Sequence, residues 1–261
     1  MDQIKSKESD LLRDIMKKSL LFFLFSLRSL TVAILATFIF GIPALIVALL
    51  DRTGRAPYRI GQVWARMILR LNGVRIRAVG LENIDRNRSY VFFSNHQSNL
   101  DGLAIGTTLP SPLRFVIKKS LLRIPIMGQA FKLGRMIPID RRDGRSAVDT
   151  INRYGRELRN GISVLFFGEG RRSRDGRLQP FKKGGFIFSI TSKLPLVPIT
   201  VANSFNLMPS GVVGIKKGTI TIIIGKAIPT IDCGIDHVES LMNRVHSVIS
   251  ENLENHSTCK V

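Results

Sequence analysis

The stretch YVFFSNHQSNLDGLAI, residues 90–105, contains three sequence patterns in succession. It begins with the apolar, β-prone run YVFF and continues through the polar residues QSN. Asp101 then stands immediately before the apolar run GLAI, at a position where aspartate is often a helix N-cap. The stretch therefore predicts a strand, a tight loop and the first turn of a helix.

His96 and Asp101 lie on either side of this loop, five positions apart. On a helix, five residues rotate the chain by about 500°, which leaves the two side chains roughly 140° apart, and on a strand an odd spacing puts them on opposite faces. Only a bend brings the two side chains together. Two interpretations are open here: the histidine and the carboxylate act as a pair, or Asp101 only caps the helix and His96 is an ordinary loop residue.

The sequence from Val74 onward alternates short apolar runs with helical patterns, and it contains no repeat, low-complexity tract or long linker. Several runs are apolar throughout, as expected for strands of a sheet that is covered on both faces. The predicted strands are Ser89–Ser94, Leu113–Ile117, Arg135–Ile139, Ser163–Phe167, Leu196–Ala202 and Thr219–Gly225. We therefore predict an α/β domain over residues 74–261, with a mostly parallel or mixed central sheet flanked by helices.

Apolar residues at helical spacing mark two further helices of this domain. One is carried by Ala147, Ile151, Tyr154 and Leu158 and stops at Gly161, and the last by Val238, Leu241, Met242, Val245 and Ile249. The histidines other than His96 are His237, His246 and His256, and they lie on or beyond the last helix. They lack metal-ligand spacing, so we expect them at the surface and predict no metal site.

Residues 1–73 have the features of a membrane-associated helical segment. Ser29–Leu50 carry no charge, and at about 1.5 Å per residue this length crosses a hydrocarbon core of about 30 Å. The apolar stretch is too long for a signal peptide and lacks a small-residue cleavage pattern. Gly41 and Pro43 are expected to kink a helix in its second half.

A second, amphipathic helix is predicted after this segment. Its apolar face is formed by Ile60, Val63, Trp64, Met67, Ile68 and Leu71, and its polar face by Arg59, Gln62, Arg66 and Arg70. This pattern suits a helix that lies on an anionic membrane surface. The alternative is a helix whose apolar face packs in the protein core and whose arginine face is in solvent.

The chain is strongly basic, with 39 Lys and Arg against 19 Asp and Glu and a formal net charge of +20. Such a charge favours a polyanionic partner: nucleic acid, an anionic membrane or a phosphorylated substrate. A nucleic-acid binder would leave the apolar N-terminus unexplained, and base-stacking aromatic residues are scarce, with one Trp and three Tyr. We therefore expect no nucleic-acid partner. The two cysteines, Cys233 and Cys259, form no disulfide framework and favour a reducing compartment.

Three more polar clusters follow predicted strands, where ligands collect in open α/β sheets. Lys118 and Lys119 form the first cluster and residues 140–142, Asp-Arg-Arg, the second. The third, residues 168–174, combines Gly168, Glu169 and Gly170 with arginines and Ser173. Backbone N–H groups, guanidinium groups and a hydroxyl together suit a phosphate site, although solvated arginine runs of this kind are also common.

In chain order these clusters resemble the glycerolipid acyltransferases, a family that includes the 1-acylglycerol-3-phosphate acyltransferases. NHQSNLD resembles the Asn-His-x-x-x-x-Asp motif of that family, and KKSLLRIPIMGQAFKLGRMIPIDR resembles its second block. FFGEGRRS resembles the Phe-Pro-Glu-Gly-Thr-Arg-Ser block, and LVPI the fourth. The resemblance runs from about Leu81 to Val201. Gly168 stands for the usual proline and Arg171 for the usual threonine.

The resemblance implies acyl transfer from a thioester, acyl-CoA or acyl carrier protein, to a glycerolipid hydroxyl. His96 is then the general base and Asp101 orients its imidazole. The function expected is acylation of lysophosphatidic acid at its sn-2 hydroxyl to give phosphatidic acid, with no cofactor. No Gly-x-Ser-x-Gly elbow is present and neither cysteine is near His96 in sequence, so direct attack by the acceptor is the simpler route. The residues expected to bind substrate are Lys118, Lys119, Arg141, Glu169, Gly170, Arg172 and Ser173, with residues 181–185 as a possible further wall.

Other acceptors fit the same base, including glycerol 3-phosphate, a lysophospholipid or a lyso-aminolipid. A membrane-bound scaffold without activity is a further alternative, although the intact His96 and Asp101 pair argues against it. The expected location is a membrane, with lipid substrate and anionic surface as partners and the catalytic domain on the cytoplasmic side.

Overall fold

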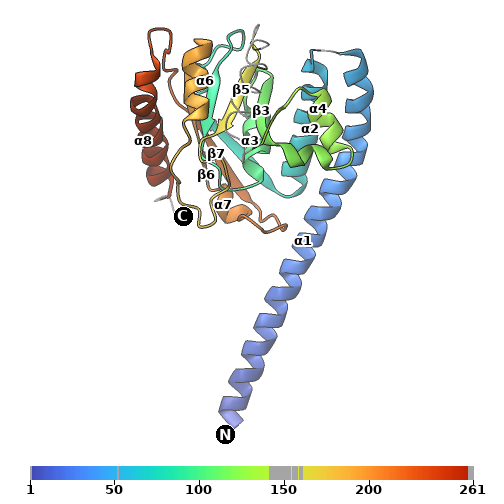
Figure 1. Cartoon of the computed structure of the whole chain (residues 1–261). Coiled ribbons are helices and arrows are strands. Elements are labelled where there is room, and N and C mark those ends of the chain that lie inside the picture. The colour runs from blue at the N-terminus through green and yellow to red at the C-terminus, as the bar shows by residue number, and fades with distance from the viewer. Residues whose placement is uncertain (1, 52, 141–153, 155–157, 159–160, 258–261) are drawn as a thin grey trace.

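The computed structural model describes residues 2–51, 53–140, 154, 158 and 161–257. Its centre is a seven-stranded sheet of order β1-β7-β6-β2-β5-β3-β4 (Figure 1). The strands β6, β2, β5, β3 and β4 are parallel, whereas β7 is antiparallel to β6 and β1 is parallel to β7. The prediction of a mixed central sheet flanked by helices is confirmed.

The strands are β1 (Val74–Val79), β2 (Val91–Ser94), β3 (Leu113–Lys118), β4 (Ile137–Ile139), β5 (Ser163–Phe167), β6 (Leu196–Ala202) and β7 (Gly218–Ile224). Six of them were predicted to within two residues at either end. The sequence analysis missed β1, although its sequence VRIRAV alternates apolar and charged residues as an edge strand with one wet face does.

The helices are α1 (Asp2–Leu50), α2 (Arg55–Leu71), α3 (Leu100–Thr108), α4 (Met127–Leu133), α6 (Gly184–Ser192), α7 (Ser204–Leu207) and α8 (Val238–Ser257). Short 3-10 turns are η1 (Leu81–Asn83), η2 (Lys119–Arg123) and η3 (Ile235–His237). The last predicted helix is α8. The helix predicted to end at Gly161 falls mostly outside the described residues, as does Arg141.

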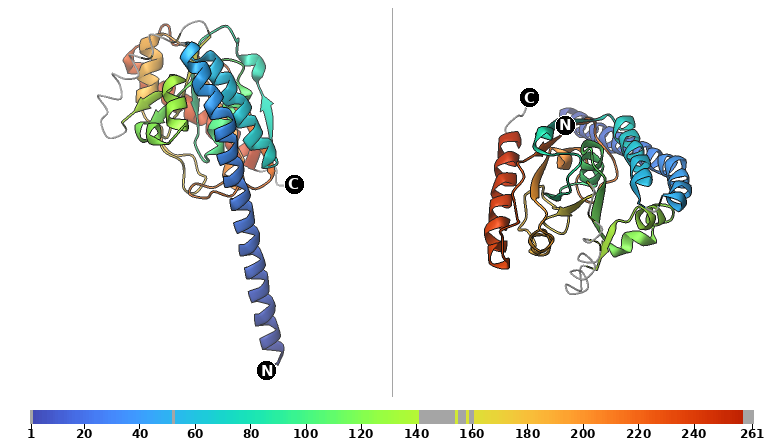
Figure 2. Two further views of the ribbon diagram at one scale, coloured as in Figure 1. Left: turned by 90° about the vertical axis from the view of Figure 1, so that its right-hand side faces the viewer. Right: turned by 90° about the horizontal axis from the view of Figure 1, so that it is seen from above.

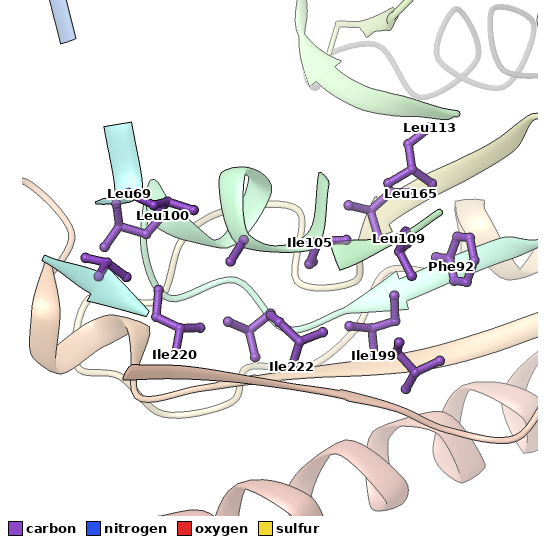
Figure 3. Close-up of a cluster of buried hydrophobic side chains, with 14 of the residues drawn as sticks. Leu69, Phe92, Leu100, Ile105, Leu109, Leu113, Leu165, Ile199, Ile220 and Ile222 are labelled. Atoms are coloured by element: carbon purple, nitrogen blue, oxygen red, sulfur yellow. The ribbon is translucent and has the colours of Figure 1, made fainter. Parts of the chain in front are cut away.

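Two apolar clusters cover the two faces of the sheet. On β2, Phe92 points into the cluster that α1, α2 and α3 complete, while Val91 and Phe93 point into the cluster beneath α6 and α8. Figure 3 shows part of the first cluster, in which Leu100, Ile105 and Leu109 lie across from residues of β6 and β7. Burial on both faces explains why the central strands are apolar throughout.

Helix α1 is much longer than the domain it packs against. It is continuous through Gly41 and Pro43, and its N-terminal part projects beyond the domain at the edge where the parallel strands end (Figures 1 and 2). Ser26 of this helix lies against Gly214 of the domain, and residues 19–25 before it are exposed. Ser19–Leu50 is long and apolar enough to cross a membrane, with 17% of its most apolar window buried.

Helix α2 corresponds to the predicted amphipathic helix, but its buried face differs from the prediction. Ile68 is buried as expected, whereas Val63 and Leu71 are 47% and 51% exposed. The buried residues are Pro57, Tyr58, Ala65, Ile68 and Leu69, and the helix packs between α1 and α3. This packing agrees with the alternative interpretation, in which the helix packs in the core and its arginine face is in solvent.

Candidate active site

The loop after β2 bends so that Asp101 faces back toward His96. His96 Nδ1 lies 2.9 Å from Asp101 Oδ2, and the same oxygen accepts hydrogen bonds from the backbone N–H groups of Gln97 (2.7 Å) and Ser98 (2.8 Å). The Asp101 side chain is fully buried, and the His96 side chain is 16% exposed. The two residues therefore form a pair, which the spacing in sequence left open.

Asp101 is not the N-cap of α3, so that part of the prediction is wrong. The N-cap position is Asn99, which makes no side-chain capping hydrogen bond, and Asp101 lies inside the first turn of the helix. Its carboxylate instead accepts N–H groups from the loop that precedes the helix. The carboxylate still lies in the first turn of the helix, at the positive end of the helix dipole.

The histidine tautomer follows from this contact. An ionised carboxylate only accepts hydrogen bonds, so Nδ1 carries the proton and Nε2 presents a lone pair. The imidazole also stacks on Phe167, the last residue of β5, with ring centroids 3.8 Å apart and planes inclined by 15°. The carboxylate and the aromatic ring together fix the orientation of Nε2.

The loop after β5 holds the backbone of His96 from the opposite side. Glu169 Oε1 accepts the His96 backbone N–H at 2.7 Å, and the Ser173 backbone N–H donates to the His96 carbonyl at 2.8 Å. These two loops meet because β2 and β5 are parallel neighbours in register, with Ser94 opposite Phe167. Both backbone groups of His96 are thus fixed by the GEGRRS loop.

Glu169 is buried, with 3% of its surface exposed. Burial raises the pKa of its carboxyl from 4.5 to about 7. The backbone N–H groups of His96 and Gln179 act in the opposite direction and lower this pKa, whereas the charge of Asp101 raises it further. Its Oε2 has no hydrogen-bond partner among the described residues. This placement makes Glu169 a positioning residue for His96, whereas the sequence analysis assigned it to substrate binding.

Two glycines let neighbouring side chains lie against this loop. Gly170 has φ +68°, and a Cβ there would lie 3.0 Å from the side chain of Lys182. At Gly168 a Cβ would lie 2.8 Å from the ring of Phe181, so the glycine that replaces the family proline makes room for this phenylalanine. Phe181 in turn packs edge-on against His246, with centroids 5.0 Å apart, so that histidine is partly buried and not a surface residue as predicted.

The predicted phosphate ligands of this loop differ in how available they are. Ser173 is buried and its hydroxyl donates to Asp175 at 2.8 Å, so this hydroxyl is engaged within the loop. Arg172 is half-buried and Arg171 is exposed, and no described carboxylate forms an ion pair with either guanidinium. Arg172 is therefore the stronger candidate ligand for an anion in this loop.

Lys118 and Lys119 lie at the same edge of the sheet as His96. They are exposed at the carboxyl end of β3, two strands from β2, a lateral separation of about 10 Å. In the segment after β5, Lys183 forms an exposed ion pair with Glu239 at 2.6 Å. No cluster of metal-ligating side chains occurs among the described residues.

Two functional neighbours of His96 were missed by the sequence analysis. Buried Asn95 exchanges two hydrogen bonds with the backbone of Val201, at 2.9 and 2.8 Å, and so ties the catalytic loop to β6. Phe167 provides the stacking surface for the imidazole. Asn95 directly precedes the histidine in the family motif, which was the available signal, whereas the Phe167 contact depends on strand register.

The fold and this site define an α/β protein with a His–Asp pair at the carboxyl edge of its sheet. The fold is similar to the crystal structure of PlsC, the 1-acyl-sn-glycerophosphate acyltransferase from Thermotoga maritima, with a TM-score of 0.79 and 20% identity over 93% of this chain and 99% of that one. The sequence matches the family model described as Acyltransferase over residues 75–202.

Curated relatives agree with this match. A 1-acyl-sn-glycerol-3-phosphate acyltransferase of Pseudomonas aeruginosa is 32% identical over 205 residues, which cover 76% of this chain and 79% of that protein. A chloroplastic one of Brassica napus is 37% identical over 185 residues, 70% of this chain and 53% of that protein. The chain therefore belongs to the acyltransferase family. The match spans 53% and 56% of the length of the chloroplastic relatives from Brassica napus and Arabidopsis thaliana.

Proposed function

We propose that the protein is a 1-acyl-sn-glycerol-3-phosphate acyltransferase, which transfers a fatty acyl group from a thioester to the sn-2 hydroxyl of lysophosphatidic acid. The observation that carries this proposal is the buried Asp101 carboxylate on His96 Nδ1, which leaves Nε2 as a base beside a loop that carries Arg172. The names of the relatives supply the substrate class.

The reaction follows from the orientation of the imidazole. The acceptor hydroxyl is un-ionised at neutral pH, so Nε2 removes its proton as the oxygen attacks the thioester carbonyl. The imidazolium that forms is stabilised by the Asp101 carboxylate, through a charge-assisted hydrogen bond. When the tetrahedral intermediate collapses, the C–S bond breaks and the departing thiolate takes the proton from Nε2. The base is then ready for another cycle.

The phosphate of the acceptor is bound by the cations around this base. Arg172 offers two parallel N–H donors that match phosphate oxygens, and Lys118 and Lys119 add charge from β3. Arg141, in a segment outside the described residues, is a further proposed ligand. The donor is acyl-CoA or an acyl carrier protein thioester, and no cofactor takes part.

The proposed location is a membrane, with the catalytic domain on its cytoplasmic side. Helix α1 supports the attachment, because large apolar side chains from Leu20 to Leu50 remain 40–86% exposed along it. This exposed surface is far too apolar to face water over such a length. The part of α1 that leaves the domain does so at the edge where the parallel strands end (Figure 1). His96 follows β2 at this same edge, which supports an active site that faces the lipid.

The deciding experiment is a panel of acceptors with the purified protein and one labelled acyl-CoA. We expect lysophosphatidic acid to be the preferred acceptor over glycerol 3-phosphate, lysophosphatidylcholine and a lyso-aminolipid. A preference for another member of the panel would keep the acyltransferase chemistry and overturn the acceptor. Absence of transfer to every acceptor, also with an acyl carrier protein thioester, would support the scaffold alternative.

A further inference from the structure

An open basic pocket lies away from the proposed active site, at the start of β1 and β7. It has a volume of about 590 Å³ and is lined by Arg70 and Gly73 at the end of α2, by Val74 and Arg75 of β1, and by Lys217, Gly218 and Thr219 of β7. Counting across the sheet, β1 is three strands from β2, so the pocket is about 14 Å to the side of the catalytic loop.

The three cations of this pocket are not neutralised by the protein. Arg70, Arg75 and Lys217 are exposed, and no carboxylate among the described residues lies within ion-pair distance of them. One function for Arg70 alone would be to offset the negative end of the α2 dipole, which amounts to about half a charge. Three full positive charges exceed that requirement, so the pocket has a strong net attraction for an anion.

The floor of the pocket is shaped by glycine. Gly73 has φ +72°, and a Cβ at this position would lie 2.8 Å from the Lys217 side chain. At Gly218 a Cβ would lie 2.5 Å from Leu207. The chain is therefore compact here, and the stem of Lys217 lies directly over Gly73. Lys217 lines the same pocket as Arg70 and Arg75.

The pocket also adjoins the exposed apolar helix. Ser29 of α1 donates a hydrogen bond to Asn72 at 2.8 Å and accepts one from the Ile215 backbone at 3.1 Å. Asn72 immediately precedes Gly73, and Ile215 is two residues before Lys217. These contacts hold α1 against the segments that line the pocket, so the pocket lies where the apolar helix meets the domain.

We propose that this pocket binds the phosphate of an anionic phospholipid other than the acceptor, and so fixes the domain on the membrane surface. Guanidinium groups pair with phosphate oxygens through two hydrogen bonds, and the ammonium of Lys217 adds a point charge. The position beside α1 places the pocket next to lipid headgroups when α1 is in the membrane. The pocket is a second lipid site, separate from the one that His96 serves.

Flotation of the full-length protein with vesicles tests this proposal without any reliance on activity. The vesicles are phosphatidylcholine with or without a fixed fraction of phosphatidylglycerol. A cation near an anionic membrane contributes roughly fivefold to partitioning, so the triple variant Arg70→Gln/Arg75→Gln/Lys217→Gln should bind the anionic vesicles on the order of 100-fold less. Binding to pure phosphatidylcholine, which depends on α1, should stay unchanged.

The adjacent lysines give a matched control within one loop. Lys216 and Lys217 are both exposed, but only Lys217 lines the pocket. Lys217→Gln should lower partitioning by about fivefold and Lys216→Gln by less than about twofold. Equal losses of partitioning in the two variants would show that binding depends on diffuse surface charge, and would overturn the proposal of a specific phosphate-binding pocket.

A second control identifies the source of the phosphate. Acyl-CoA also carries phosphates, so the triple variant is assayed in neutral detergent with acyl-CoA varied. An unchanged KM for acyl-CoA supports the lipid, whereas a raised KM together with unchanged flotation would assign the pocket to the thioester donor. If the proposed acyltransferase activity were absent altogether, the flotation results would still decide the proposal.

Discussion

Replacing Glu169 by glutamine tests how burial controls the ionisation of a residue that holds the backbone of His96. Glutamine keeps an oxygen to accept the His96 N–H, which Glu169 Oε1 receives at 2.7 Å, and removes the charge. Because burial raises the pKa of this carboxyl from 4.5 to about 7, the folded state binds a proton that the unfolded state has already released at intermediate pH. The stability of the wild type therefore falls as the pH rises from about 4.5 through about 7.

The magnitude follows from the two pKa values. Each pKa unit corresponds to 1.36 kcal/mol, so an ionised Glu169 costs the folded protein up to about 3 kcal/mol at pH 8. Glutamine avoids this cost but leaves an amide N–H unpaired where Glu169 Oε2 has no partner, at about 1 kcal/mol. The variant should be slightly less stable than the wild type at pH 5 and about 2 kcal/mol more stable at pH 8.

Thermal unfolding in detergent at several pH values between 5 and 8 measures this difference. At roughly 2–4 °C per kcal/mol for a chain of this size, the gap in Tm between variant and wild type should change by about 5–10 °C over the range. Glu82→Gln, at an exposed glutamate in η1, is the surface control against which the change for Glu169→Gln is measured. A constant gap for Glu169→Gln would refute the argument, because it would mean that Glu169 ionises alike in folded and unfolded chains.

Three further predictions concern the base, the phosphate site and the anchor. His96→Ala should lower acyl transfer by about 10²–10⁴-fold with little change in Tm, and turnover within about threefold of wild type would remove His96 from the mechanism. Arg172→Lys should raise the acceptor KM and leave the thioester KM nearly unchanged, while the exposed neighbour Arg171→Lys should have a smaller effect; steady-state kinetics with a normal acceptor KM for Arg172→Lys would refute the phosphate assignment. Deletion of residues 2–25, which precede the Ser26 contact with Gly214, should weaken membrane attachment but keep the domain folded. A truncated protein that pellets with membranes as completely as the full chain after a high-salt wash would show that this part of α1 is not needed.

The fold was largely predictable because burial on both faces leaves a clear sequence signal. Strands such as β2 and β6 contribute to both apolar clusters, so their sequences are continuous apolar runs. Strand β1 lies at an edge with its residues mostly exposed, and its alternating sequence VRIRAV was not recognised as a strand. The face of α2 that became buried was also mispredicted, because both α1 and α3 contact the helix and it buries a broader surface than a single stripe.

Within the candidate site, the sequence identified the chemistry better than the partners. His96 and Asp101 were predicted as a pair in which Asp101 orients the imidazole, but the sequence also suggested Asp101 as a helix cap, and it assigned Glu169 to substrate binding. The structure adds that both carboxylates accept backbone N–H groups, Asp101 from Gln97 and Ser98 and Glu169 from His96. Which N–H groups lie near a carboxylate depends on how two loops meet, and the loops meet only after β2 and β5 have paired.

The sequence by itself determined six of the seven strands, the last helix, the apolar N-terminal segment and the polar clusters that follow the strands, because these depend on local pattern and composition. Tertiary structure alone decided that Glu169 is buried beneath His96, that Phe167 stacks on the imidazole, and that Arg70, Arg75 and Lys217 share one pocket. In each case the residues come from strands or helices far apart in the chain, and pairing energies between such segments are set by sheet register and core packing. The spacing of residue types along the chain does not specify the register between distant strands, so these contacts can be identified only in the assembled sheet.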